Sequence, residues 1–406
     1  MKLIPFILIL LLSTITLSQN RKSIKVKKGK WNAQLDLNKF DFLPFTLKVK
    51  KNLISIINAE ETIVLDRLTI QNDSIHARFP YFNSELVFVS NKKHLSGYFV
   101  NYNKGDDYKI PFNAKKKRSS RFSFIKKKAK SKNLKGKWEV YFEPNTENTY
   151  PALGVFTQEE NKNIIAGTFL TETGDYRFLA GNVTNDSLYL SCFDGSHAFL
   201  FKAKINGDSL QGRFFSGNHW ESKWLATRND NFKLKSPEEL TYLKKKAVVE
   251  FKLPQLNGDT LSFPNDFFKN KVVIIQIMGT WCPNCLDESI YYKDLYNRYH
   301  SKGLEIISVC YEAGKSFDDY IMNVARLKNK LNLDFTFLIG GSASKGLASK
   351  HFNMLNNVIS FPTSIYIGRD GEVKRIHTGF NGPGTGDYYL DYKQSTNALI
   401  ESLLKD

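Results

Sequence analysis

The sequence predicts an α/β domain at the C-terminal end of the chain, preceded by two repeated antiparallel all-β units. Three observations support this prediction. From about residue 248 onward, β-branched runs alternate with segments of helical periodicity, which is typical of an α/β sheet. Before that point, short runs of alternating apolar and polar residues are separated by turn residues, which favours antiparallel strands. The β-rich part also contains several short motifs twice, in the same order.

The N-terminal residues 1–18 have the features of a secretory signal peptide. Lys2 supplies a positive charge, an apolar run follows over 3–12, and small polar residues lead to Ser18. The apolar run is shorter than the roughly 20 residues that a membrane-spanning helix requires. We therefore expect cleavage after Ser18 and export of the mature protein to the periplasm, or to the extracytoplasmic face of the membrane.

Residues 19–113 and 134–230 are the two predicted β units. Each contains about eight candidate strands, a number that can close an up-and-down barrel, and a β-sandwich is the alternative. Motifs recur between the units in the same order: Gly29-Lys30-Trp31 with Gly136-Lys137-Trp138, Asn72-Asp73-Ser74 with Asn185-Asp186-Ser187, and Leu95-Ser96-Gly97-Tyr98-Phe99 with Leu210-Gln211-Gly212-Arg213-Phe214. This order favours an internal duplication. Neither unit has a recognisable catalytic constellation, and their histidines lack the spacing of metal ligands.

The net charge of +18 is concentrated before the C-terminal domain. Residues 1–230 contain 36 Lys and Arg against 21 Asp and Glu, a surplus of 15, whereas residues 231–406 contain 22 against 19, a surplus of 3. Residues 114–133 contain no acidic residue and form a predicted basic linker between the β units. We interpret this linker as a solvated connector, with peripheral contact to an anionic surface as the alternative. A second linker, residues 231–247, leads to the C-terminal domain.

The chain contains four cysteines, Cys192, Cys282, Cys285 and Cys310, which are too few for a disulfide framework. Cys282 and Cys285 form a Cys-x-x-Cys motif between an apolar strand and a predicted helix. At a helix N-terminus, free N–H groups and the helix dipole favour a thiolate on Cys282, and Cys285 lies one turn further on. Pro283 fits the first helical turn. Cys192 and Cys310 fall within apolar strands and are interpreted as small buried hydrophobes.

The C-terminal domain should contain alternating strands and helices. Strands are predicted at 272–278, 304–310 and 335–339, a hairpin at 363–367 and 373–377, and helices at 285–300, 317–331, 343–352 and 395–404. Ser236-Pro237 gives a further helix-start signal within the second linker.

Residues 248–406 resemble the TlpA/ResA-like thiol–disulfide oxidoreductases of the thioredoxin superfamily. The resemblance rests on the sequence Gly279-Thr280-Trp281-Cys282-Pro283-Asn284-Cys285 after a buried strand, and on Phe361-Pro362-Thr363, which looks like the family's cis-proline loop. It also rests on an extra strand–helix segment at 304–331, and on Glu288, placed as Cys-x-x-Cys-x-x-Glu. The resemblance implies a thioredoxin-like α/β fold.

The resemblance also implies the roles of the site residues. Cys282 is the expected nucleophile and Cys285 the resolving thiol, supported by Trp281, Pro283, Glu288, Phe361, Pro362 and Thr363. Glu288 could tune the thiol pKa and shuttle a proton, with a solvated carboxylate on the helix surface as the alternative. Gln276 stands where thioredoxin itself carries a buried acid. We expect no cofactor and no metal.

The favoured function is therefore an exported, reductase-like thiol–disulfide oxidoreductase. Its expected partners are disulfide-containing or dithiol protein substrates and an upstream electron donor, either membrane-bound or soluble; no nucleic acid partner is expected outside the cytoplasm. One alternative is a peroxiredoxin-like thiol peroxidase, although its Pro-x-x-x-Thr-x-x-Cys pattern does not occur around Cys282. Another is a ligand-binding or scaffold protein in which the Cys-x-x-Cys is a structural disulfide or half of a zinc site.

Overall fold

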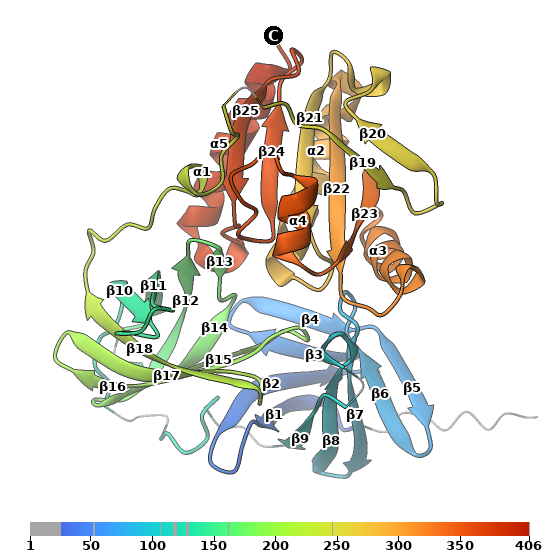
Figure 1. The fold of residues 1–406 in the computed structure, drawn as a ribbon. Coiled ribbons are helices and arrows are strands. Elements are labelled where there is room, and N and C mark those ends of the chain that lie inside the picture. Colours follow the sequence, from blue (N-terminus) through green and yellow to red (C-terminus); the bar gives the residue numbers. More distant parts are fainter. Residues whose placement is uncertain are drawn as a thin grey trace, which may run out of the picture.

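Alternating apolar residues fold residues 29–228 into β-sheets, and longer apolar runs form the core of an α/β domain after them. The computed structural model describes residues 26–405, except residues 52, 106, 117–119, 127–129, 161 and 246. The predicted signal peptide, residues 1–18, lies outside the described residues. In Figure 1 the two β units, blue and green, lie side by side below the C-terminal domain, which is coloured yellow to red.

The first β unit is an up-and-down barrel. Its strands are β1 (Gly29–Asp36), β2 (Phe42–Lys50), β3 (Leu53–Asn58), β4 (Glu61–Leu65), β5 (Arg67–Gln71), β6 (Ser74–Arg78), β7 (Ser84–Asn91), β8 (His94–Asn101) and β9 (Lys109–Lys115). Consecutive strands pair antiparallel and β1 pairs with β9, so that the only unpaired neighbours among the described strands are β4 and β5. These two are separated by Asp66 alone and form one bent segment, which pairs with β3 through its first half and with β6 through its second. When this bent segment is counted as one strand, the sheet closes into a barrel of eight strands.

The second β unit closes in the same way. Its strands are β10 (Gly136–Phe142), β11 (Tyr150–Gln158), β12 (Ile164–Thr171), β13 (Gly174–Asp175), β14 (Leu179–Val183), β15 (Ser187–Phe193), β16 (Ala198–Asn206), β17 (Ser209–Ser216) and β18 (Trp220–Arg228). β10 pairs with both β11 and β18, and β12 joins β11 to β14, which completes the barrel. The short β13 forms a hairpin with β12 and extends toward the C-terminal domain (Figure 1). Both units are thus barrels rather than sandwiches.

The interior of the second barrel is filled by aromatic side chains. Phe201 stacks on Phe214 with ring centroids 4.5 Å apart and lies 4.7 Å from Phe169. Trp138 and Trp224 are completely buried in the same cluster. A small barrel can hold a ligand or fill with its own side chains. The second barrel is filled with its own side chains.

The basic linker is not the solvated connector that its lysines suggest. Phe122 and Ile125 are buried, and the Arg121 guanidinium donates hydrogen bonds to Asn58 in the first barrel and to Ser191 in the second. The interpretation as a solvated segment is therefore wrong for Arg121, Phe122 and Ile125, because two apolar side chains among the lysines anchor the chain between the barrels.

The C-terminal domain has the predicted thioredoxin-like α/β fold. Its central sheet has the strand order β23-β22-β21-β24-β25. These strands are β21 (Val272–Met278), β22 (Leu304–Glu312), β23 (Thr336–Ser342), β24 (Thr363–Ile367) and β25 (Val373–Thr378), and the helices of the domain are α2 (Pro283–Tyr299), α3 (Phe317–Leu331), α4 (Lys345–His351) and α5 (Asp387–Leu403). β21, β22 and β23 run parallel, and β24 and β25 are antiparallel additions. Every residue of β21 is buried, as expected of a central strand covered on both faces.

Two features of this domain differ from the sequence-based expectation. The closing helix α5 begins at Asp387 rather than at residue 395, because Tyr389 and Tyr392 pack against Phe380 and extend the helix toward the core. A hairpin of β19 (Phe251–Pro254) and β20 (Thr260–Phe263) had no counterpart in the prediction. The helix-start signal in the second linker forms the short helix α1 (Pro237–Leu240), capped by the Ser236 side chain.

None of the helices in the described ranges is long and apolar enough to cross a membrane.

Candidate active site

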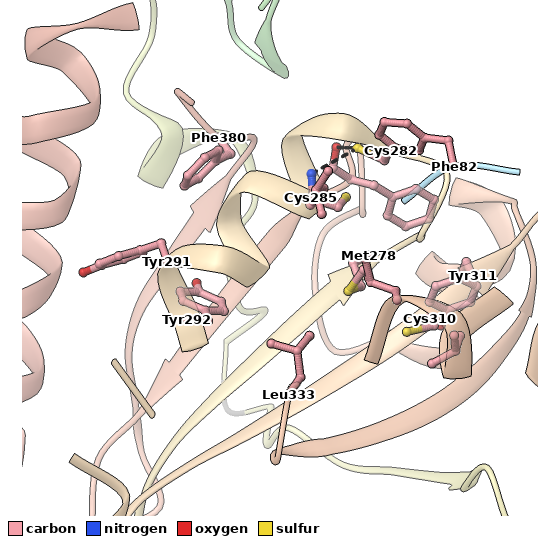
Figure 2. Close-up of a cluster of buried hydrophobic side chains, with 14 of the residues drawn as sticks. Phe82, Met278, Cys282, Cys285, Tyr291, Tyr292, Cys310, Tyr311, Leu333 and Phe380 are labelled. Atoms are coloured by element: carbon pink, nitrogen blue, oxygen red, sulfur yellow. Dashed lines mark hydrogen bonds between the residues drawn. The ribbon is translucent and has the colours of Figure 1, made fainter. Parts of the chain in front are cut away.

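The two cysteines of the Cys-x-x-Cys motif lie where strand β21 leads into helix α2 (Figure 2). Cys282 is the N-cap of the helix, and its Sγ accepts a hydrogen bond from the Cys285 N–H at 3.4 Å. Pro283 occupies the first turn, where its missing N–H leaves no unmet hydrogen bond. Both cysteines are free thiols; Cys282 is 8% exposed and Cys285 is completely buried. The helix therefore presents one sulfur at its tip and holds the second behind it.

The proline loop lies against the first cysteine. The Phe361–Pro362 peptide bond is cis, as the resemblance implied. The Cys282 thiol donates to the Phe361 carbonyl oxygen at 3.5 Å. Thr363, the first residue of β24, is buried and donates from its Oγ1 to the Ser360 carbonyl at 2.9 Å, which fixes the end of the loop.

Trp281 completes the surroundings of Cys282. Its indole Nε1 donates to the Tyr311 carbonyl at 2.9 Å, and its ring meets Phe361 edge-on at 6.0 Å. Gly279 permits this position of the indole, because a Cβ there would lie 2.4 Å from Trp281 Nε1. The structure thus brings together Trp281, Pro283, Phe361, Pro362 and Thr363 around Cys282.

Glu288 is buried inside the domain and is not a solvated surface carboxylate. It has no exposed surface and accepts four hydrogen bonds, from Gln276 Nε2 at 2.9 Å and from Tyr292 OH, Ser364 Oγ and Tyr392 OH at 3.1 Å each. Burial raises the pKa of the Glu288 carboxyl to about 7, and the four hydrogen bonds limit the rise. A carboxyl with this pKa can both release and accept a proton near neutrality.

Gln276 and Cys285 lie around the same buried carboxyl. The Gln276 amide donates to Glu288 and accepts from Ser308 Oγ at 2.7 Å, so that its orientation is fixed from both sides. Burial raises the pKa of the Cys285 thiol well above its ordinary value, and the hydrogen bond with Cys282 and the charge of Glu288 act in the same direction. Cys285 is therefore protonated at neutral pH.

A second buried glutamate, Glu312, was missed by the sequence analysis. It ends strand β22 and accepts hydrogen bonds from Thr280 N at 2.8 Å and from Thr280 Oγ1 at 2.6 Å. Burial raises the pKa of its carboxyl to about 7. Glu312 holds the loop that carries Trp281 and Cys282. An acid that directly follows the apolar run at the end of this strand was the available signal.

The β units also contribute residues next to the motif. Ser196, in the loop between β15 and β16, donates from its Oγ to the Trp281 carbonyl at 2.8 Å. Thr173, in the β12–β13 turn, accepts from Ser360 Oγ at 2.8 Å through its carbonyl. Phe82 of the first barrel belongs to the same cluster of buried side chains as Cys282 (Figure 2). No local sequence signal pointed to these contacts.

Arg177 joins all three folded parts of the chain. Its guanidinium pairs with Glu61 of the first barrel at 2.6 Å, with Asp194 of the second at 3.5 Å, and with Asp287 on helix α2. The Arg177 side chain is 4% exposed. Burial raises the pKa of Asp287 to about 7, although Arg177 opposes the rise. We call these four residues the Arg177 cluster.

Known proteins share the C-terminal part of this architecture. Residues 243–390 match the Redoxin family. Thiol-disulfide oxidoreductase ResA of Halalkalibacterium halodurans is 29% identical over 134 residues, which are 32% of this chain and 66% of that protein. ResA of Bacillus cereus is 31% identical over 140 residues, which are 34% of this chain and 70% of that protein.

The shared part is limited in extent. The matches to the first two ResA proteins span 66% and 65% of their length, slightly less than two-thirds. Among solved structures, a thioredoxin-family thiol:disulfide interchange protein from Chlorobium tepidum is 16% identical and aligns over 40% of this chain and 99% of its own, with a TM-score of 0.31.

Proposed function

This chain belongs to the thiol-disulfide oxidoreductase family that includes ResA, and on that premise we propose that it exchanges disulfides through Cys282 and Cys285. The observation that carries the proposal is the position of Cys282, at the N-terminus of α2 with its Sγ 3.5 Å from the Phe361 carbonyl in the proline loop. A sulfur placed there has an N–H donor that can stabilise negative charge. Beside it runs a backbone segment with which an extended substrate can pair.

The proposed reaction has two steps. The Cys282 thiolate attacks a substrate disulfide; one Cys282–substrate bond forms, the substrate S–S bond breaks, and the leaving thiolate takes up a proton. Cys285 then loses its proton and attacks Cys282 Sγ, which releases the second substrate thiol. The substrate gains two electrons and two protons, and the Cys282–Cys285 dithiol becomes a disulfide, which an upstream electron donor must reduce again.

Glu288 is the proposed base for the second step. Cys285 has to lose its proton within a buried site, and Glu288 interacts electrostatically with that thiol. With a pKa of about 7, its carboxyl is partly ionised at neutral pH and can take up the proton. In the described hydrogen bonds the Glu312 carboxyl contacts only Thr280, so we assign Glu312 the role of a positioning residue.

The direction of the reaction and the location of the protein belong to the same proposal. We propose a reductase-like protein in the periplasm, on the strength of the family and of the signal-like residues 1–18. A reductase should have a reduction potential near that of thioredoxin, about −270 mV, rather than that of a strong oxidant, about −120 mV. Export is tested by fusing residues 1–18 to alkaline phosphatase, which is active only outside the cytoplasm.

The proposed domain organisation accompanies this function. It comprises a signal peptide (1–18), two β units (19–113 and 134–230), two linkers (114–133 and 231–247) and the thioredoxin-like domain (248–406). An origin of the two barrels by duplication is supported by a matching contact. Trp31 Nε1 donates to the Lys27 carbonyl at 2.9 Å, and Trp138 Nε1 donates to the Leu134 carbonyl at 3.0 Å, each four residues upstream.

The decisive experiment uses residues 19–406 and the variants Cys282→Ser and Cys285→Ser. The parent protein should catalyse the reduction of insulin by dithiothreitol, and both variants should lose this activity. Cys285→Ser should accumulate a mixed disulfide on Cys282, whereas Cys282→Ser should not. Absence of catalysis together with absence of the mixed disulfide would overturn the proposal. Rapid peroxide consumption would favour a thiol peroxidase instead, and stoichiometric bound zinc would favour a structural motif.

A further inference from the structure

We propose that the β12–β13 hairpin of the second barrel is a gate over the substrate-binding face of the thioredoxin-like domain, and that a disulfide-bearing polypeptide reaches Cys282 only after this hairpin moves away. The inference rests on the proposed function, since it concerns how a substrate enters that site. The gate consists of residues 171–176 around β13, which extends from the barrel toward the C-terminal domain (Figure 1).

The hairpin backbone lies on the backbone of the proline-loop region. The Thr173 carbonyl accepts a hydrogen bond from Ser360 Oγ at 2.8 Å, one residue before Phe361. Gly379 has a φ of 76° and approaches so closely that a Cβ there would lie 2.9 Å from the Thr173 carbonyl carbon and 3.2 Å from Gly174 N. An extended polypeptide substrate would need the same surface, because it also binds through main-chain groups. The hairpin and the substrate therefore compete.

The contacts continue on both sides of Cys282. A Cβ at Gly174 would lie 2.2 Å from Asn284 Nδ2, so the hairpin is packed tightly against one of the two residues between the cysteines. On the other side, Ser196 Oγ donates to the Trp281 carbonyl at 2.8 Å. Cys282, whose sequence neighbourhood makes these contacts, is only 8% exposed. A sulfur that has to meet a disulfide in another protein cannot do so while covered in this way.

Charged contacts hold the hairpin closed. Asp175 accepts from Gly382 N at 2.7 Å, and Arg177 pairs with Asp287 on α2. Arg177 also pairs with Glu61 and Asp194, so its place within the β units does not depend on the contact with α2. The ion pair with Asp287 can break while the barrels keep theirs. Removing one partner of a buried ion pair is strongly destabilising, so loss of the Asp287 charge should weaken this contact.

A space beside the hairpin suits an incoming chain. A cavity of about 400 Å³ lies between the mouth of the second barrel and the start of α2, and Tyr150, Tyr176, His197, Phe199 and Asn284 line it. Asn284 is 8% exposed, and its Oδ1 has no hydrogen-bond partner in the described part of the structure. A buried carbonyl oxygen needs a donor, and a main-chain N–H of a bound polypeptide would supply one.

The test measures access to Cys282 in the full mature chain carrying Cys285→Ser. The rate of Cys282 modification is measured with iodoacetamide, which is small, and with a maleimide attached to a long polyethylene glycol. Asp287→Asn removes the α2 side of the closing ion pair, and Ser360→Ala removes the hydrogen bond to Thr173. The matched control, Lys330→Gln, breaks the ion pair between Lys330 of α3 and Asp66 of the first barrel, which also joins the domains but lies away from the hairpin.

Opening of the gate should increase mainly the rate at which the large reagent modifies Cys282. We expect Asp287→Asn to raise its rate about tenfold relative to the small reagent, by shifting the population toward the open form. Ser360→Ala should act in the same direction, and Lys330→Gln should leave the ratio unchanged. An unchanged ratio in both gate variants would overturn the gate. Circular dichroism of each variant distinguishes opening of the gate from unfolding of the protein. If Asp287→Asn does not fold, the test of the gate rests on Ser360→Ala, which removes no charge.

Insulin reduction, measured with Cys282 and Cys285 both present, distinguishes failure of the gate proposal from failure of the proposed oxidoreductase function. If the parent chain reduces insulin and the gate variants are no faster, the gate is wrong and the oxidoreductase stands. If Cys282 reacts with both reagents but neither parent nor variants reduce insulin, the proposed function fails.

Discussion

Asp287 and Glu288 are neighbours on helix α2, yet they face opposite regions of the molecule. Both are buried, and burial raises the pKa of each to about 7. Glu288 points into the thioredoxin-like domain, where an amide and three hydroxyl groups donate to it. Asp287 points out of the domain and pairs with Arg177 of the second barrel. One helix thus carries two carboxylates of similar acidity in very different surroundings.

The difference teaches what each carboxylate can do. Hydroxyl and amide groups remain neutral and can reorient when Glu288 gains a proton, so its titration leaves no buried charge without a partner. The Arg177 guanidinium stays charged, so protonation of Asp287 removes part of its compensation. We infer that the inner face of α2 serves proton transfer and that the outer face serves domain contact.

The largest loss of stability should come from replacing Arg177, the cation that Asp287 on the outer face of α2 shares with Glu61 and Asp194. Arg177→Gln leaves Glu61, Asp194 and Asp287 buried without a guanidinium, and the free energy of unfolding should fall by about 3–5 kcal/mol. Urea denaturation of the mature chain measures this change. A loss below about 1 kcal/mol, as for an exposed ion pair, would contradict a buried contact on this side.

Glu288 on the inner face should contribute its own part of the pH dependence of stability. The Glu288 pKa is about 7 in the folded protein against an ordinary value of 4.5, so between these values the folded protein holds a proton that the unfolded chain has released. Stability therefore falls as pH rises through this window, by about 3 kcal/mol for this group. Glu288→Gln should remove that part of the fall, which urea denaturation at pH 4.5, 6 and 8 measures. An unchanged slope would place the Glu288 pKa near its ordinary value.

Glu288 on the inner face and Asp287 on the outer face should differ in their effect on the second chemical step, the attack of Cys285 on the mixed disulfide. A mixed disulfide is formed on Cys282 with a small aromatic thiol, and its release by Cys285 is followed in a single turnover at pH 7. Glu288→Gln should slow this release about 100-fold, because a positioned base is lost. Asp287→Asn should change it by no more than about twofold, within the range expected of a group that does not take part. Equal losses in both variants would end the distinction between the faces.

The smallest effect should come from the remaining ion pair between domains. Lys330 and Asp66 are partly exposed, and Lys330→Gln should lower the free energy of unfolding by less than about 1 kcal/mol. Thermal unfolding at low and high salt measures the difference, which should disappear at high salt because exposed charges are screened. A loss as large as that of Arg177→Gln would mean that this exposed ion pair contributes as much to stability as the buried Arg177 cluster does.

Much of the C-terminal domain could be predicted because its signals are local. The apolar run 272–278, the Cys-x-x-Cys motif at a helix start and the Phe361-Pro362-Thr363 loop each specify their own structure. The helix predicted at 317–331 has those bounds in the structure. The closing helix was less predictable, because the burial of Tyr389 and Tyr392 depends on Phe380 from another segment.

The contacts that matter most between domains could not be predicted. The sequence gives Asp287 and Glu288 the same character, and only their partners distinguish them. Arg177 is 110 residues away from Asp287 along the chain, and nothing in its local sequence indicates a shared cluster. Glu288 was recognised as a candidate through the resemblance, but its four donors lie on three other elements and on α2 itself. Long-range polar contacts leave no periodic pattern.

Barrel closure also has a consequence for the order in which the chain folds during synthesis. In each barrel the first strand pairs with the last, β1 with β9 and β10 with β18, so neither barrel can close until its whole sequence has left the ribosome. The intermediate pairings are local hairpins that form early, and the closing pair is the late, long-range step. In the second barrel the β11–β12 pairing completes the sheet, and in the first barrel β4 and β5 are the only described strands of the sheet with one paired neighbour. The few remaining strand edges limit the exchange of strands between the two tandem barrels.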